Sequence, residues 1–398
     1  MATETDLGPV QQQVDDLLQQ KPPSSTEPAE FLAAQFDAGL AWPDFPPGEG
    51  GLGADRSLRR DVQQALTQAG APDASRANPH GYHMGSAILR AHGTDAQRQR
   101  YLRPMFTAQE RWCQLFSEPG AGSDLAGLAC RAERDGDSWL VTGQKVWSSG
   151  ALHADIGMLV TRTDPTVPKH RGMTYFLLDM HAPGVDVRPL RQMTGDAEFC
   201  EVFLDRVRVP DDARLGEEGD GWRVTIGTLM AERYMLGSGT AEARPIDFAL
   251  ELYQERAAGD PVIRDRLTGL WIRGRALQLL AARLASRPAS QQGPEGSMVK
   301  AGLSALNQET YDLCMDLLDS DAMLYETYVV EPAPAGRRSG RPDAGGTDVR
   351  RRFLRSRANS IEGGTSEIML NILGERVLGL PPDVRLDKDR PWSAIPRS

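Results

Sequence analysis

The chain has 398 residues, 40% of them apolar and 25% charged, a balance typical of a globular protein with a sizeable core. Its net charge of −10 argues against general binding to nucleic acid or to an anionic membrane surface. There is no apolar run of the ~18–20 residues that a membrane span needs, no secretory leader pattern, and no metal-ligand or disulfide spacing among the four cysteines and six histidines. We therefore expect a cytoplasmic protein with reduced thiols, no metal site and no nucleic-acid partner.

Residues 1–112 predict an N-terminal α-helical domain. Apolar residues recur at helical spacing in two stretches, at Val10, Val14, Leu17 and Leu18 and again at Val62 and Leu66. Thr94 with Gln97 three residues later is a capping-box pattern that opens a further helix. The Pro/Gly-rich segment "WPDFPPGEGGLGAD" predicts a loop between helices.

Residues 113–219 predict a central antiparallel β-domain. Short segments rich in Val, Leu, Thr and aromatic residues follow one another, separated by turn residues: "SWLVTGQKVW", "IGMLVTRT", "GMTYFLLDM", "GVDVRPL" and "CEVFLDRVRV". Their number and spacing fit a small sandwich or barrel.

From residue 220 to 380 the apolar period returns to helical spacing, and we expect a C-terminal helical domain. Helices are predicted after Gly221, over roughly 243–285 and 296–318, and after Thr365. A Pro/Gly/Arg-rich break covers 331–352, and an irregular tail covers 381–398. The order helices, strands, helices indicates an α+β fold, and no GxGxxG follows a strand, which disfavours a dinucleotide-binding βαβ domain.

Two segments of the β-domain have residues suited to a ligand. In "CQLFSEPGAGSD" (113–124), glycines permit close backbone approach and Ser117 and Ser123 offer hydroxyl groups; a plain β-turn is the alternative. In "GQKVWSSGA" (143–151), Trp147 stands beside Ser148 and Ser149 and could cover an aromatic cofactor; a core tryptophan is the alternative.

Two segments of the helical domain place charged groups among apolar ones. "LMAERYMLG" sets Glu232 and Arg233 in an apolar helix that leaves little polar face for them, although both could face solvent. In "NSIEGGTSEIM" (359–369), a Gly-Gly turn precedes a helix that Thr365 or Ser366 can cap, a corner that can bind an anion or be ordinary structure.

Together these segments resemble the acyl-CoA dehydrogenase family of flavoproteins, from about residue 30 to 380. "CQLFSEPGAGSDLAGL" is similar to its first motif, "GQKVWSSGA" to the tryptophan segment of its β-domain, and "FCEVFLDRVRVP" to the strand that closes that domain. "IEGGTSEIMLNILGERVLGLP" is similar to its C-terminal motif. The resemblance implies the acyl-CoA dehydrogenase fold: an N-terminal helical domain, a central antiparallel β-domain and a C-terminal four-helix bundle.

The resemblance also implies FAD as the cofactor and an acyl-CoA thioester as the substrate. The residues that it assigns to FAD are Gln114, Leu115, Phe116, Ser117, Gly122, Ser123, Trp147, Ser148, Ser149, Thr365 and Glu367. Those that it assigns to the substrate are Ser123, Arg233, Glu362 and Gly363. The reaction would be α,β-dehydrogenation to the trans-2-enoyl-CoA, by α-proton abstraction and β-hydride transfer to flavin N5.

The resemblance assigns the catalytic base to Glu232. One group of the family carries the base in the C-terminal motif, but its position is occupied here by Gly363, and Glu362 is one residue away. A second group carries it on the first bundle helix directly before an arginine, as in Glu232-Arg233. Burial raises the pKa of such a carboxylate toward the working pH, where a general base is most effective.

The chain departs from the family at two places that usually hold the FAD of a neighbouring subunit. Arg256 lacks the phenylalanine that normally follows three residues later, and "DLLDSDAMLYE" (316–326) has acids where glycines are usual. We therefore keep open a homodimer, a homotetramer and a mixed-chain tetramer. We also keep open a complementary, non-catalytic subunit and a related flavin oxidase or monooxygenase. The expected electron acceptor is electron-transfer flavoprotein.

Overall fold

The computed structural model describes residues 4–237, 245–285, 293–324, 348–384 and 387–396, and these residues form two compact units. The first unit combines Met1–Arg188, Cys200–Thr228 and Asp389–Ser398, and the second combines Pro189–Phe199 with Leu229–Lys388. The first unit therefore holds the helices of the N-terminal part, most of the β-domain and the C-terminal tail.

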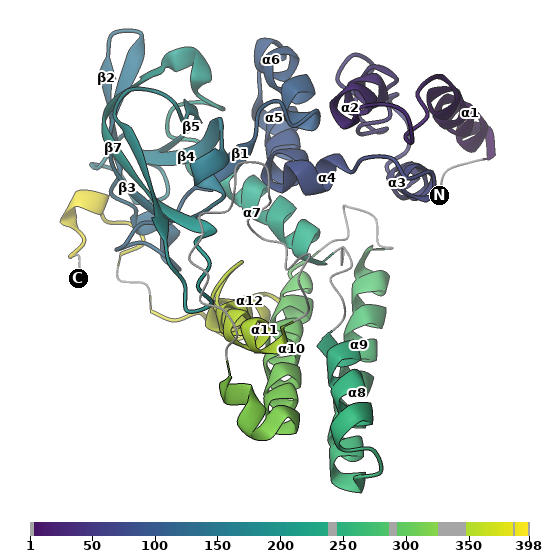
Figure 1. Ribbon diagram of the computed structural model, residues 1–398. Helices are drawn as coiled ribbons and strands as arrows, with labels where there is room; N and C mark the ends of the chain where they lie inside the picture. The colour runs from purple at the N-terminus through teal and green to yellow at the C-terminus, as the bar shows by residue number, and fades with distance from the viewer. Residues whose placement is uncertain (1–3, 238–244, 286–292, 325–347, 385–386, 397–398) are drawn as a thin grey trace. The chain divides into compact units, whose positions relative to one another are not determined.

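The N-terminal helices of the first unit are drawn in purple and blue in Figure 1. They are α1 (Glu4–Gln20), α2 (Pro28–Asp37), α3 (Leu58–Gln68), α4 (Ala74–Ala77), the π-helix η1 (His80–Gly85), α5 (Ser86–His92) and α6 (Asp95–Phe106). The expected apolar stripe of α1 is confirmed, because Val10, Val14 and Leu17 are buried in one cluster with Val62 and Leu66 of α3. The capping box of α6 is also confirmed.

The β-domain is a seven-stranded sheet in the described part of the chain. Its strands are β1 (Trp112–Leu115), β2 (Arg131–Asp135), β3 (Ser138–Ser149), β4 (Ile156–Arg162), β5 (Met173–Asp179), β6 (Val185–Leu190) and β7 (Phe199–Pro210). The order along the sheet is β1-β4-β2-β3-β7-β6, with β5 paired to β4. β4 is buried along its whole length, as continuous apolar strands of a covered sheet are.

Sequence reasoning missed two of these strands, and with them the parallel pairings in an otherwise antiparallel pattern. β1 pairs with β4 in parallel, with Gln114 opposite Met158, and β2 touches β4 in parallel at a single position. β1 has only four residues, and β2 ("RAERD") buries only Ala132. Neither strand is long or apolar enough to show a period of two.

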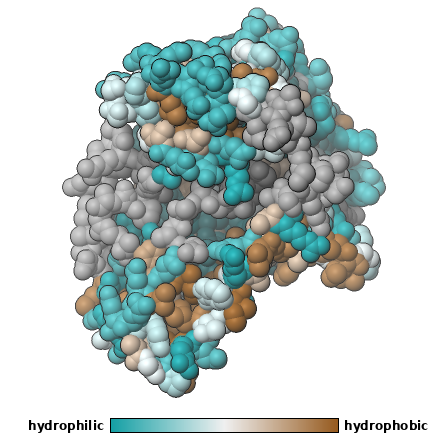
Figure 2. All heavy atoms as spheres, turned by 90° about the vertical axis from the view of Figure 1, so that its right-hand side faces the viewer, coloured by the Kyte–Doolittle hydropathy of each residue, from teal (hydrophilic) through white to brown (hydrophobic). Residues whose placement is uncertain are grey.

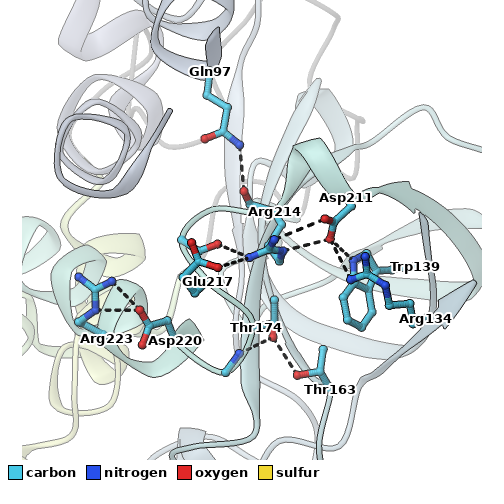
Figure 3. A network of polar contacts seen from close by, with 12 residues as sticks. Gln97, Arg134, Trp139, Thr163, Thr174, Asp211, Arg214, Glu217, Asp220 and Arg223 are labelled. Atoms are coloured by element: carbon cyan, nitrogen blue, oxygen red, sulfur yellow. Dashed lines mark hydrogen bonds and ion pairs between the residues drawn. The ribbon is translucent and has the colours of Figure 1, made fainter. Parts of the chain in front are cut away.

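A polar network ties the helical part of the first unit to the end of β7 (Figure 3). Gln97 of α6 donates from Nε2 to the backbone carbonyl oxygens of Asp212 (2.7 Å) and Arg214 (2.9 Å). The Arg214 guanidinium in turn contacts Asp211, which accepts a 2.7 Å hydrogen bond from the indole of Trp139 on β3. The capping residue Gln97 therefore also joins α6 to the sheet.

The second unit is a helical bundle built around α10 (Gly296–Leu318). The other helices are α8 (Pro245–Arg256), α9 (Pro261–Ala285), α11 (Val349–Ser356) and α12 (Ser366–Arg376), and α7 (Gly221–Gly237) enters this unit after Thr228. α10 packs against α8, α9, α11 and α12. The shared core of these helices includes Phe248, Leu306, Leu313 and Cys314. In both units together, all four cysteines of the chain are buried free thiols, as expected.

The helical region expected over roughly 243–285 consists of two helices, α8 and α9. α8 ends at Arg256, and Gly259 takes a φ of 94°, which a side chain would resist. Asp260 then accepts hydrogen bonds from the backbone of Val262 and Ile263, and Pro261 begins α9. Most of the break expected over 331–352 lies outside the described residues.

Several large apolar side chains of α9 are exposed. Val262 (67% exposed), Trp271 (57%) and Leu279 (57%) are examples. Figure 2 shows brown atoms interspersed with teal ones in the lower part of the face it presents. Exposed apolar surface can take part in a protein–protein contact.

Candidate functional site

The loop after β1 is a tight turn with a defined anchor. The Glu118 and Ala121 backbones exchange two hydrogen bonds of 3.0 Å, and the Val146 N–H donates to the Ser117 carbonyl (2.9 Å). A Cβ added at Gly122 would meet nothing within 4 Å, so the backbone there is open to an approaching ligand. The expected residues Gln114, Phe116 and Ser117 thus lead directly into an accessible turn.

A buried ion pair between β3 and this turn stabilises the turn. Lys145 of β3 is fully buried, and its Nζ donates to Glu118 Oε1 (2.8 Å) and to the Phe116 carbonyl (3.1 Å). Glu118 also accepts backbone N–H groups from Ala129 (2.7 Å) and Cys130 (2.9 Å). Sequence reasoning missed both charged residues; the lysine inside the β-pattern "GQKVW" was the available signal.

The end of β3 presents an aromatic face and a hydroxyl group. Trp147 is 60% exposed and has a φ of 60°, unusual for a bulky residue and costly by ~1–3 kcal/mol. The core alternative for Trp147 is therefore wrong. Ser148 is buried, and its Oγ has no hydrogen-bond partner within the described residues, while Ser149 is half-buried.

In the second unit, Glu232 lies half-buried on α7, and the side chain of Arg233 lies outside the described residues. The charge of Glu232 is one of three carboxylate charges that oppose the lowering of the pKa of Lys300 by burial.

The corner before α12 has the backbone that its sequence predicts. Gly363 and Gly364 have φ values of 62° and 92°, and the Thr365 hydroxyl caps α12 by accepting from the Ile368 N–H (3.2 Å). Lys300 Nζ donates to the carbonyl oxygens of Asn359 (2.8 Å) and Gly364 (2.5 Å) and so fixes both ends of the turn. Glu367 lies exposed in the first turn of the helix.

Glu362 is engaged in an ion pair. Its two carboxylate oxygens accept from the guanidinium of Arg355 (3.0 and 2.8 Å), and one also accepts from the Asn359 amide (2.9 Å). Arg355 contacts Glu198 as well (3.2 Å), and burial raises the pKa of Glu198. Both carboxylate oxygens of Glu362 are thus occupied by a bidentate pair with Arg355, whereas a catalytic base needs an oxygen that can contact the substrate.

The two segments that depart from the family pattern meet each other at the surface of the second unit. Arg256 pairs with Asp321 (2.8 Å), and Arg266 pairs with Asp316 (2.9 Å). Arg350 donates to the Asp321 carbonyl (2.8 Å). Asp316 and Asp321 are therefore each neutralised by an arginine of their own chain.

Within the described ranges, no cluster of side chains could hold a metal ion, and none of the helices is long and apolar enough to cross a membrane.

Three family models match consecutive parts of the chain. They are the acyl-CoA dehydrogenase N-terminal domain over residues 6–109, the middle domain over 113–207 and the C-terminal domain over 219–378. The chain therefore belongs to the acyl-CoA dehydrogenase family. Its fold is the acyl-CoA dehydrogenase fold, and it is a flavoprotein oxidoreductase with FAD as cofactor, which acts on acyl-CoA.

Individual relatives agree with this assignment. The chain is 37% identical over 351 residues to acyl-CoA dehydrogenase IpdE1 of Mycobacterium tuberculosis, covering 87% of this chain and 86% of that protein. It has the same identity over 351 residues to FadE34 of that organism, but there it spans only 46% of the relative. Among solved structures, the ChsE4-ChsE5 complex of M. tuberculosis matches with a TM-score of 0.69 and 26% identity, over 96% of this chain and 99% of that chain.

The residues at the end of β3 fit a flavin. An exposed indole offers a planar apolar surface, and the unsatisfied hydroxyl of buried Ser148 offers a hydrogen bond that the protein itself does not fill. The open turn at Gly122 and the hydroxyl of Ser123 add room and polar groups suited to a phosphate.

Proposed function

We propose that Glu232 is the general base that removes the α-proton of an acyl-CoA thioester, giving the trans-2-enoyl-CoA. The observation that carries this proposal is the contrast between two glutamates of the same unit. Glu232 lies half-buried on α7, whereas both oxygens of Glu362 are occupied by Arg355. A carboxylate already held in a bidentate pair is a poor proton acceptor.

FAD supplies the acceptor for the β-hydride at flavin N5. The chain's own residues bind and orient the reactants. The residues we propose to hold FAD are Gln114, Leu115, Phe116, Ser117, Gly122, Ser123, Trp147, Ser148, Ser149, Thr365 and Glu367. Gly363 and Gly364 leave room for the thioester, and the backbone N–H of Glu362 or Gly363 would donate to the developing enolate oxygen. Arg233 and Ser123 would position the substrate.

The test of the base is a pair of matched variants. Glu232→Gln keeps the shape of the side chain and removes the base, so turnover should fall by ~10²–10⁴-fold while FAD stays bound. Glu362→Gln should keep most activity, because its role is to pair with Arg355. Near-normal turnover of Glu232→Gln, together with loss of activity in Glu362→Gln, would move the base to Glu362.

Anaerobic bleaching of the yellow flavin absorbance by a panel of acyl-CoA thioesters would identify the substrate. The panel should contain straight-chain, branched and steroid-side-chain thioesters. The same assay with added electron-transfer flavoprotein would test that acceptor. Glu232→Gln should bind the substrates without bleaching.

A second candidate is a complementary subunit of a mixed-chain dehydrogenase. Arg256 and Asp321, where the family usually reaches toward a neighbour's FAD, pair with each other here. FadE34 is more than twice the length of the match to this chain, and ChsE4-ChsE5 is a complex of two named components. The exposed apolar side chains of α9 would suit a partner chain.

The state of the chain expressed alone separates these candidates. A yellow homodimer or homotetramer that is bleached by an acyl-CoA supports the self-sufficient enzyme. A colourless chain that takes up FAD only after a second dehydrogenase-like chain is added supports the mixed assembly.

A further inference from the structure

The turn before α12 leaves the backbone N–H of Gly363 available. The N–H groups of Ile361 and Glu362 both donate to the Ala358 carbonyl (2.8 and 2.9 Å), so they are used within the turn. The Gly363 N–H has no hydrogen-bond partner within the described residues. Of the two backbone donors considered for the enolate oxygen, Gly363 therefore supplies the one that is not already engaged.

The backbone around Gly363 does not fix its own position. Gly363 and Gly364 adopt φ values of 62° and 92°, and because glycine has more conformational freedom than any other residue, contacts from outside must hold this conformation. On one side, Lys300 of α10 donates from Nζ to the carbonyl oxygens of Gly364 (2.5 Å) and Asn359 (2.8 Å). The carbonyl side of the two glycines is thereby attached to α10.

Arg355 of α11 holds the other side of the two glycines, through Glu362. Its Nη1 and Nη2 donate to the two carboxylate oxygens of Glu362 (3.0 and 2.8 Å), and the Asn359 amide donates to one of them (2.9 Å). A bidentate guanidinium–carboxylate pair fixes direction as well as distance, which the point charge of a lysine does not. The Gly363 N–H thus lies between two attached points, the Glu362 side chain and the Gly364 carbonyl.

Arg355 is oriented in turn by the segment that leads into β7. Its Nε lies 3.2 Å from Glu198 Oε1, and its guanidinium carbon lies 5.6 Å from the centre of the Phe199 ring. The Glu198 side chain is only 18% exposed, so this contact is shielded from water. Residues Pro189–Phe199 belong to the second unit together with α11 and the turn. Arg355 therefore joins three segments of one unit.

We propose that Arg355 is a positioning residue that holds the Gly363 N–H where it can donate to the thioester oxygen as the enolate develops. This inference rests on the proposed function, in which this turn receives the enolate oxygen. The enolate oxygen gains charge in the transition state, so the position of its donor affects the rate of proton removal. Arg355 acts on the reaction only through Glu362 and the turn.

Four variants separate the bidentate pair from the charges that form it. Arg355→Leu removes the guanidinium, and Arg355→Lys keeps a cation without the fork. Glu362→Leu removes the pair from its other side, whereas Glu362→Gln keeps an oxygen that can accept from Arg355. Arg273→Gln is the control, because it removes a guanidinium from an exposed pair with Glu309 in the same unit. Thermal unfolding and FAD content of every variant show whether it is folded and loaded.

The first measured quantity is turnover. Arg355→Leu and Glu362→Leu should each lower kcat by ~10²-fold, the cost of misplacing a reacting group by about 1 Å, and should change KM much less. The double variant should be no slower than either single variant, because both substitutions remove the same contact. Arg355→Lys should fall between wild type and Arg355→Leu, and Glu362→Gln and Arg273→Gln should stay close to wild type.

A second readout reports on the donor itself. The probe is an enoyl-CoA labelled with ¹³C at the thioester carbonyl, made with an acyl chain that bleaches the flavin in the panel above, and its carbonyl band is followed by infrared difference spectroscopy. A hydrogen bond lowers the frequency of a carbonyl stretch, so the band should lie at higher frequency on Arg355→Leu than on the wild type. Arg273→Gln should give the wild-type band, and a loss of stability alone would not move it.

An unmoved carbonyl band on folded, FAD-loaded Arg355→Leu would overturn the proposal, whatever its kcat. If Arg355→Leu does not fold, Glu362→Leu decides by the same measurement, since it removes the same pair. Failure of the proposed function gives a different result. Glu362→Gln would then be as inactive as Glu362→Leu, or the wild-type flavin would not be bleached by any thioester of the panel.

Discussion

At the scale of single residues, the most consequential contact in the first unit is between Lys145 and Glu118. Both are buried, and between them they bind the Phe116 carbonyl and the backbone N–H groups of Ala129 and Cys130. A buried ion pair adds little net stability, but removing one partner leaves an uncompensated charge in a low-dielectric site. The pair is therefore a determinant of the turn's shape.

Lys145→Met should lower the free energy of unfolding by ~3–5 kcal/mol, because Glu118 is left buried and unpaired. Chemical denaturation followed by tryptophan fluorescence measures the loss. The double variant Lys145→Met/Glu118→Gln should recover part of it, because no net charge then remains buried. A single variant as stable as the wild type would show that water reaches Glu118.

At the scale of elements, the π-helix η1 (His80–Gly85) concentrates two unusual histidines. Burial lowers the pKa of His80 to about 4, partly offset by a hydrogen bond to the Trp112 backbone. Burial also lowers the pKa of His83 to about 4, and nearby Asp73 opposes that shift. Both rings are therefore neutral in the folded protein at pH 7.

The first unit should lose stability as the pH falls from about 6.5 to about 4. The unfolded chain, with ordinary histidine pKa values of ~6.5, binds protons in this window that the folded chain does not, so stability rises with pH across it. The expected loss is on the order of 2 kcal/mol per ring. Urea denaturation at a series of pH values measures it.

The double variant His80→Gln/His83→Gln should flatten the pH dependence between pH 6.5 and 4, because it removes both rings whose pKa is lowered in the folded chain. An equally steep dependence in the double variant would assign the acid sensitivity to other groups.

At the scale of the whole molecule, the C-terminal tail returns to the β-domain of the first unit. Residues expected to be irregular form a short 3₁₀ turn, η8 (Trp392–Ala394). The buried Trp392 ring lies under the Arg162 guanidinium at 4.8 Å, and its Nε1 donates to the Gly127 carbonyl (3.2 Å). The tail lines a pocket together with Gly120 and Lys169, beside the turn assigned to FAD.

Trp392→Ala should destabilise the first unit by ~3 kcal/mol, at the low end of the cost of removing a buried tryptophan. Trp392→Phe should cost less, because it keeps an aromatic ring over Arg162 and loses only the indole hydrogen bond. Thermal unfolding measures both variants. If the tail were only loosely attached, both substitutions would leave the transition unchanged.

The sequence by itself determined the order of helical and β parts, the capping box at Thr94 and the turn at Gly363 and Gly364. Between the two candidate caps Thr365 and Ser366, the structure selects Thr365. These features depend on near neighbours along the chain, so the local pattern encodes them. The family assignment likewise rested on short contiguous motifs, and the family models confirmed it.

Only the tertiary structure decided which charges meet. The charged contacts described above each join residues on different segments of the chain. They are Lys145 with Glu118, Arg256 with Asp321, Arg355 with Glu362, and Lys300 with the turn before α12. A charged residue looks the same in the sequence whether it faces water or a buried partner, and its pairing depends on how the elements pack. The strands β1 and β2 were hidden for a related reason. Pairing of β1 with β4 and of β2 with β3, rather than an apolar period of their own, makes them part of the sheet.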